Sequence, residues 1–127
     1  MIEFVKISKR YGDLTVLADI SLHIAQGELT VLIGPSGSGK STMLRLINRM
    51  IEPSSGHILL HGKNTIGLDP VSMRRGIGYV IQSIGLFPHM TVLENMAVVP
   101  RILCTPKEQR FDRARELLNL MGLEPSQ

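Results

Sequence analysis

The sequence predicts an α/β fold, and three features of its N-terminal half lead to this prediction. Short segments that alternate apolar with polar or small residues are typical of strands with one buried face. A continuous apolar run at 29–33 is typical of a strand covered on both faces, as in a parallel sheet. A glycine-rich loop and an amphipathic helix at 40–50 follow this run directly, in the order of strand, loop and helix.

The remaining strands are predicted from β-branched content and from alternation. Residues 2–8 are rich in β-branched and aromatic side chains, and 20–24 and 58–60 continue the series after turns at 11–13 and 53–56. Gly62 closes the last of these strands. A further apolar segment at 77–81 is predicted as a buried strand that ends at Gln82.

The later helices are predicted from their start signals. Asp69 followed by Pro70 indicates a helix whose cap is the aspartate. Capping boxes are predicted where a threonine precedes a glutamate by three residues, at Thr91 and at Thr105. In the last helix one face is expected to carry the apolar side chains, and Gly122 is a stop signal. The residues of that face are Phe111, Ala114, Leu118 and Met121.

Length, composition and charge limit the possible functions. A chain of 127 residues suffices for one domain, and its 14 basic and 11 acidic residues give a net charge of only +3. The basic residues are dispersed, so we expect no nucleic-acid partner. Cys104 is the only cysteine, which excludes an internal disulfide. The N-terminus lacks a signal-peptide pattern, and no apolar run approaches the ~20 residues that span a bilayer.

The loop from Gly34 to Ser41 has the pattern Gly-x-x-x-x-Gly-Lys-Ser, which cradles the phosphates of nucleoside triphosphates. Its glycines permit unusual backbone angles, so that the amides of 36–40 can point toward an anion at the positive end of the following helix. Lys40 is expected to reach the β and γ phosphates, and Ser41 to bind Mg²⁺. The candidate nucleotide-binding residues of this segment are Gly34, Ser36, Gly37, Ser38, Gly39, Lys40, Ser41 and Thr42.

A flexible Gly-Ser linker is the alternative interpretation of this segment. It is disfavoured because the motif lies between an apolar run and an amphipathic helix, where phosphate binding requires it. The motif alone leaves the class of protein open, since ATPases, GTPases and kinases all use it.

Four further features lie in the same order along the chain as in one family. They are Tyr11, the loop GPSGSGKST at 34–42, the turn at 52–56 followed by a strand and Gly62, and the segment 77–82. With them the whole chain resembles the N-terminal half of the ATP-binding subunit of an ABC transporter. The resemblance implies a P-loop NTPase core with an antiparallel β subdomain, incomplete at the C-terminus. Residues 1–90 would form the β subdomain and core, and 91–127 the start of a helical subdomain.

The resemblance also assigns roles to single residues. Tyr11 would stack on adenine, and Gln82 would contact Mg²⁺ and the attacking water. The candidate catalytic residues are therefore Lys40 and Gln82. Alternatively, Tyr11 covers a hydrophobic edge and Gln82 is an ordinary polar residue at a strand end. His57 and His61 flank one strand, but without an evident third ligand a metal site is disfavoured.

The segments 82–92 and 48–53 resemble the importers of glycine betaine, choline and related quaternary-amine osmoprotectants. This implies a cytoplasmic protein on the inner face of the membrane, paired with a second ATP-binding subunit and with a membrane-spanning permease. The candidate contact with the permease is formed by Leu86, Phe87, Pro88 and His89. The same apolar residues could equally be part of the core.

Three readings of the function follow. The first is the energy-coupling ATP-binding subunit of an osmoprotectant importer. The second is a nucleotide-binding fragment without turnover, because the sequence has neither the motif Leu-Ser-Gly-Gly-Gln nor an apolar strand ending in Asp-Glu after Gln82. The third is a small P-loop kinase, which is disfavoured because no acceptor-site pattern is present.

Overall fold

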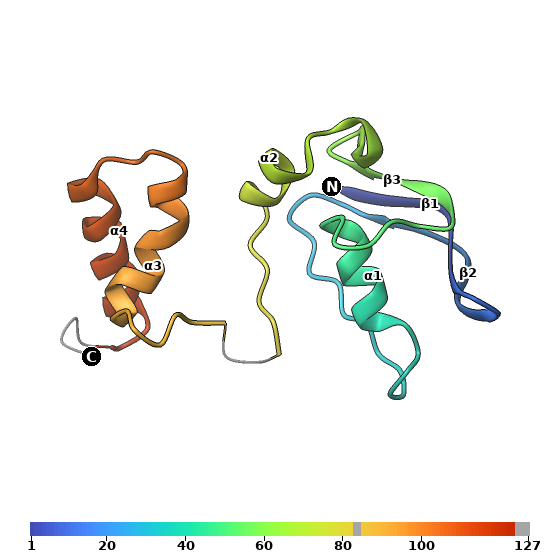
Figure 1. The fold of residues 1–127 in the computed structure, drawn as a ribbon, viewed down its shortest axis with the longest axis horizontal. Helices are drawn as coiled ribbons and strands as arrows, with labels where there is room; N and C mark the ends of the chain where they lie inside the picture. Colours follow the sequence, from blue (N-terminus) through green and yellow to red (C-terminus); the bar gives the residue numbers. More distant parts are fainter. Residues whose placement is uncertain (83–84, 124–127) are drawn as a thin grey trace. The chain divides into compact units, whose positions relative to one another are not determined.

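The computed structural model describes residues 1–82 and 85–123 of the 127-residue chain. The chain divides into two compact units, the first formed by Met1–Ile77 and the second beginning at Gly78. Figure 1 traces the sheet and its neighbouring helices in the first unit and a pair of helices in the second.

The first unit is built on a four-stranded sheet with the strand order β2-β1-β3-β4. β1 (Ile2–Tyr11) and β2 (Leu14–Ile24) form an antiparallel hairpin, and β3 (Ser55–Leu60) pairs antiparallel with the other edge of β1. The short β4 (Lys63–Asn64) pairs with β3. The predicted strands at 2–8, 20–24 and 58–60 are therefore confirmed, and each is longer than its sequence pattern indicated.

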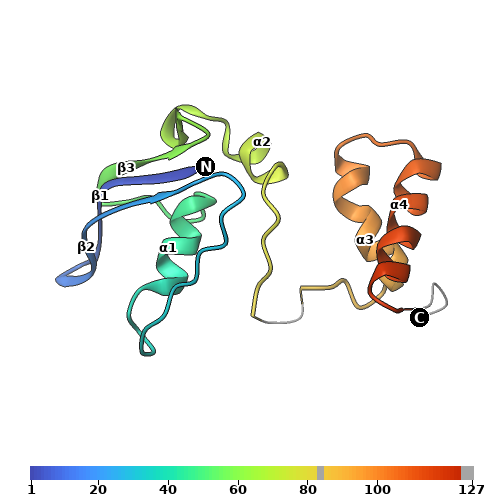
Figure 2. The same ribbon diagram turned by 180° about the vertical axis from the view of Figure 1, so that it is seen from behind.

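The hydrophobic core of this unit lies between the sheet and α1 (Lys40–Ile47). Figures 1 and 2 show the helix beside the strands from opposite sides. The register of β1 shifts between Phe4 and Ile7, and this irregularity brings both side chains into the core. The buried members of the core are Phe4, Ile7, Leu17, Leu46 and Ile58.

The chain after the sheet forms a 3-10 turn, η1 (Thr65–Gly67), and the short helix α2 (Pro70–Arg75). Asp69 caps α2 as predicted, because its carboxylate accepts a hydrogen bond of 2.7 Å from the amide of Ser72. α1 is shorter than the predicted 40–50. It ends before Arg49, whose φ of +52° lies in the left-handed region that terminates a helix.

The second unit consists of α3 (Val92–Ile102) and α4 (Lys107–Leu120), which pack against each other. The capping box of Thr91 and Glu94 is confirmed at the start of α3, as is the stop at Gly122, whose φ is +71°. The second capping box is wrong. α4 begins at Lys107 behind Pro106, because Thr105 belongs to the turn that leaves α3 and its amide donates to the carbonyl oxygen of Pro100 at 2.9 Å.

Two predicted buried strands do not form. Residues 29–33 and 77–81 run as irregular chain, with Leu29 90%, Ile33 92% and Val80 95% exposed. A segment becomes a central strand only where neighbouring strands satisfy its amides and carbonyls. Within residues 1–82 and 85–123, no strand pairs with either segment. The apolar residues of both segments are suited to a buried strand, but the described chain provides no neighbouring strand to bury them.

Candidate functional site: a glycine-rich phosphate loop

The glycine-rich loop at 34–39 leads directly into α1. Gly39 is the N-cap of the helix with a φ of +89°, and Gly37 has a φ of +81°. Both angles lie in the left-handed region, which glycine occupies without steric strain. The backbone therefore turns sharply before the helix, which begins at Lys40 as the sequence predicted.

Gly39 also lies where a side chain has no room, whereas at Gly34 only the movable side chain of Ser38 is close. A Cβ atom on Gly39 would be 2.7 Å from Cδ2 of Leu17 and 3.2 Å from the carbonyl oxygen of Val16. A Cβ atom on Gly34 would be 2.8 Å from Oγ of Ser38. Val16 and Leu17 belong to β2, at a point where its register against β1 shifts. The irregular part of β2 thus packs against the start of α1 and positions the loop.

Lys40 folds back over the loop that precedes it. Its Nζ donates to the carbonyl oxygens of Gly34 at 2.8 Å and Pro35 at 2.7 Å, and to Oγ of Ser38 at 3.2 Å. An ammonium has three N–H donors, so these contacts use all of them. The positive charge is consequently held at the loop and not extended into solvent.

The loop offers donors to an anion. In the part of the chain that the structure describes, the amides of Gly37, Gly39 and Lys40 donate to no protein acceptor. The first turn of α1 carries no acidic side chain, and residues 34–38 are exposed. Ser41 lies in that first turn and is exposed, with Thr42 half-buried beside it. A helix N-terminus with free amides and an adjacent ammonium attracts negative charge.

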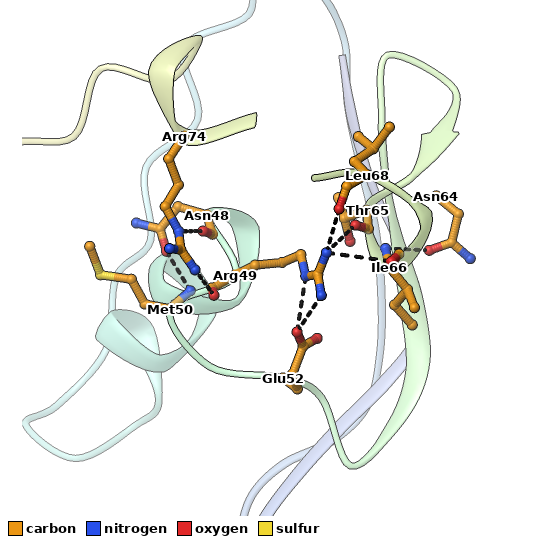
Figure 3. Close-up of polar contacts among 9 residues, drawn as sticks. All are labelled: Asn48, Arg49, Met50, Glu52, Asn64, Thr65, Ile66, Leu68 and Arg74. Atoms are coloured by element: carbon orange, nitrogen blue, oxygen red, sulfur yellow. Dashed lines mark hydrogen bonds and ion pairs between the residues drawn. The ribbon is translucent and has the colours of Figure 1, made fainter. Parts of the chain in front are cut away.

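Two arginines form hydrogen bonds at the C-terminal end of α1 (Figure 3). Nη1 of Arg49 donates to the carbonyl oxygens of Thr65 at 2.8 Å and Leu68 at 2.9 Å, while Nε and Nη2 bind the carboxylate of Glu52 at 2.9 and 2.8 Å. Arg74 of α2 donates from Nε to the carbonyl oxygen of Asn48 at 2.9 Å. These contacts link the helix that carries Lys40 to the η1 and α2 segment.

Tyr11 ends β1, opposite Leu14 across the hairpin turn. The residue is 49% exposed, and Nζ of Lys9 lies 4.9 Å from the centroid of its ring. An exposed aromatic ring at a strand end is available for stacking on a flat ligand.

Gln82 and the segment after it belong to the second unit, whereas the loop and Tyr11 belong to the first. Gln82 is exposed, as are Leu86 and Phe87. Asn95 of α3 holds the chain beside them, because its Oδ1 accepts from the amide of Phe87 at 2.7 Å and its Nδ2 donates to the carbonyl oxygen of Met90 at 3.1 Å. The structure thus places the glycines, Lys40 and Ser41 in one continuous segment of the first unit, and Gln82 in the second unit.

Sequence reasoning missed two residues of the first unit that shape the site, and one residue of the second unit that holds the loop before its own helix. Arg49 and Lys9 carry no local signal in the sequence for their contacts, which reach residues far along the chain. Asn95 lies inside a helix, where a capping role toward the preceding loop has no sequence pattern. Among the described residues no group of three His, Cys, Asp or Glu side chains is arranged for a metal ion.

The geometry fits a phosphate group. Gly37 and Gly39 have positive φ, and Gly39 has no space for a Cβ atom. In the described part of the chain the amides of Gly37, Gly39 and Lys40 have no protein acceptor, whereas the amide of Ser38 donates to the carbonyl oxygen of Pro35 at 3.3 Å. Each carbonyl contact of Lys40 can be exchanged for a phosphate oxygen, since hydrogen bonds between ionised partners are stronger than those to neutral carbonyls. The arrangement can therefore bind and neutralise a polyphosphate.

Comparison with known proteins agrees with this geometry. The family model described as "ABC transporter" matches residues 17–127. The chain belongs to the ABC transporter family. A dimeric structure of a bacterial ABC transporter cassette superposes with a TM-score of 0.84 at 32% identity, covering 99% of this chain and 59% of that one. The α/β fold with an antiparallel sheet is that of an ABC ATPase cassette, of which this chain covers a part.

Relatives of known transport systems are similar over nearly the whole chain. The glycine betaine/carnitine/choline transport ATP-binding protein of Bacillus subtilis (strain 168) is 52% identical over 98% of this chain and 33% of its own length. The glutamine transport ATP-binding protein of Escherichia coli (strain K12) is 48% identical over 97% of this chain and 52% of its own length. The chain spans about a third of the length of the Bacillus subtilis relative.

Proposed function

We propose that this chain supplies the phosphate-binding part of the ATP-binding, energy-coupling subunit of an ABC importer for quaternary-amine osmoprotectants. The single observation that carries the proposal is the loop at 34–39, with Gly37 and Gly39 at positive φ and Lys40 held over it. Support for the solute class comes from the relatives, of which the first is named for glycine betaine, carnitine and choline. A glutamine transport relative is nearly as similar, so sequence similarity supports the class of subunit more strongly than the transported solute.

The proposed ligands are ATP and Mg²⁺. The loop amides and Lys40 bind the phosphates, Ser41 and Gln82 ligate Mg²⁺, and Tyr11 stacks on adenine. Ser36, Gly37 and Ser38 form the rim of the cradle, and Thr42 adds a donor. Bound Mg²⁺ would neutralise charge on the phosphates during transfer to water.

The proposed partners are a membrane-spanning permease and a second ATP-binding subunit. The exposed side chains of Leu86 and Phe87 are candidates for the permease contact, and Asn95 holds the backbone of Phe87. Such a complex would place this chain at the inner face of the membrane. Within the described residues, no helix has the length and apolar character needed to cross a bilayer.

A second candidate is nucleotide binding without turnover. Phosphoryl transfer to water requires a positioned base and a metal clamp in addition to a cradle. The sequence after Gln82 carries no apolar strand that ends in Asp-Glu, which favours binding alone for these 127 residues.

Calorimetric titration with Mg-ATP tests the proposal. Lys40→Ala removes an ammonium that binds phosphate by charge-assisted hydrogen bonds, so we expect about a 10- to 100-fold loss of affinity. Lys63→Ala is the matched control, because Lys63 is an exposed lysine of β4. Equal affinity in Lys40→Ala and the unmodified chain would contradict the proposal. Steady-state ATP hydrolysis that depends on Lys40 would exclude the second candidate.

A further inference from the structure

Lys9 and Tyr11 form a pair at the end of β1. They are two residues apart in a strand, so their side chains project from the same face. The 4.9 Å between Nζ of Lys9 and the ring centroid of Tyr11 is within the ~6 Å of a cation–π interaction. An ammonium above one face of the ring excludes a base from that face, which leaves the opposite face for stacking.

The Lys9 ammonium is itself held in place. Its Nζ donates to the carbonyl oxygen of Glu52 at 2.7 Å, and the carboxylate of the same Glu52 is bound by Arg49. The turn around Glu52 is tied to β1 again, because the amide of Ser54 donates to the carbonyl oxygen of Ser8 at 2.8 Å. Lys9 is therefore a fixed cation beside the ring and not a freely rotating side chain.

We propose that Lys9 is a positioning residue for the nucleobase. It fixes the ring of Tyr11 and covers one face of it, so that adenine stacks on the other. The inference rests on the proposed binding of ATP at the phosphate loop and at Tyr11. A ring that is already ordered loses less conformational freedom on binding, which strengthens the contact with the base.

Two ligands separate this role from a general effect of charge. Mg-ATP carries a base and a triphosphate, whereas inorganic tripolyphosphate with Mg²⁺ carries only the phosphates. We expect Lys9→Met to weaken ATP binding about two- to fivefold, the size of an exposed cation–π interaction, and to leave tripolyphosphate binding unchanged. Lys9→Arg keeps the cation and is expected to restore ATP affinity. Lys63→Met, which removes an exposed lysine of β4, is the control for net charge.

A double-mutant cycle tests whether Lys9 acts through the ring. In a Tyr11→Ala background, Lys9→Met is expected to have no further effect on ATP affinity. The inference is overturned if Lys9→Met weakens ATP and tripolyphosphate equally, if it changes neither, or if its effect persists without Tyr11. The failure of the proposed function looks different, because then Lys40→Ala changes the affinity for neither ligand.

Discussion

Replacing Arg49 by Met tests how the phosphate-loop helix is held at its far end. The side chain of Arg49 is 14% exposed, and it supplies donors to the carbonyl oxygens of Thr65 and Leu68. Thr65 is buried, so its carbonyl loses a partner that water does not readily replace. Hydrogen bonds to charged groups contribute ~1.5–3 kcal/mol each, and the exposed pair with Glu52 contributes ~0–1 kcal/mol. With two such carbonyl contacts and the pair lost together, we expect the free energy of unfolding of the first unit to fall by about 3–7 kcal/mol.

Urea unfolding followed by tyrosine fluorescence measures this loss. The chain has no Trp and two Tyr, so in a Tyr79→Phe background the signal comes from Tyr11 in the first unit. Glu52→Gln is the matched control, because it removes the charge partner of Arg49 but keeps the contacts with Thr65 and Leu68. We expect it to cost less than about 1 kcal/mol. Equal losses in the two variants would refute the reasoning, because Arg49 would then act through Glu52 alone.

Three further perturbations test the phosphate loop and the start of α3. Gly39→Ala introduces a Cβ atom at φ +89° and 2.7 Å from Leu17, and is expected to abolish Mg-ATP binding in calorimetry. Gly62→Ala is the control, because Gly62 has a φ of +78° but open space around it. We expect it to lower the free energy of unfolding by only ~1–2 kcal/mol, the strain of the left-handed backbone. Thr91→Ala removes the cap of α3 and is expected to cost about 0.5–2 kcal/mol in urea unfolding of the second unit. Hydrogen bonds from the amide and hydroxyl of Thr91 lower the pKa of Glu94 below its ordinary 4.5, so its stabilisation of α3 is present above that pH and is lost as pH falls through the lowered pKa. Circular dichroism between pH 6 and pH 2 is expected to show this acid loss in the unmodified chain and a weaker one in Glu94→Gln, and identical curves would contradict it.

The phosphate loop and the helix starts could be predicted because their causes are local. A loop that needs glycine at positive φ must place glycine there, so Gly37 and Gly39 are visible in the sequence. A helix cap can likewise be predicted from two residues that lie three positions apart, as Thr91 and Glu94 do. The wrong prediction of a capping box at Thr105 shows the limit of such signals, because Thr105 belongs to the turn after α3 and its amide donates to the carbonyl oxygen of Pro100.

The contacts that position the loop could not be predicted. Arg49 adopts a φ of +52° and reaches carbonyl oxygens 16 and 19 residues away, and no residue pattern encodes either property. The packing of Gly39 on β2 depends on a register shift between Lys9 and Arg10, which arises only when the strands pair. Long-range contacts of this kind are set by the tertiary arrangement and not by local preference.

Residues 29–33 pair with no strand among the described residues, so it can be tested whether phosphate binding depends on the pairing of this segment. Exposed apolar side chains with unpaired backbone favour association with another chain, so we expect the protein to self-associate as its concentration rises. Ile33→Asp adds a charge at a residue that is 92% exposed, and is expected to reduce association in sedimentation experiments. Leu120→Asp on α4 is the control, since Leu120 is 82% exposed but lies in a paired helix of the second unit.

The loop is held from other directions, by Gly39 against β2, by Lys40 over Gly34, and by Arg49 at the end of α1. None of these contacts involves the backbone of 29–33. Ile33→Asp is therefore expected to leave the affinity for Mg-ATP within about twofold of the unmodified chain, a change of less than ~0.5 kcal/mol. A large loss of affinity together with the loss of association would mean that the cradle forms only when this segment is paired. A chain that is monomeric at every concentration would instead show that the exposed segment is not an associating surface.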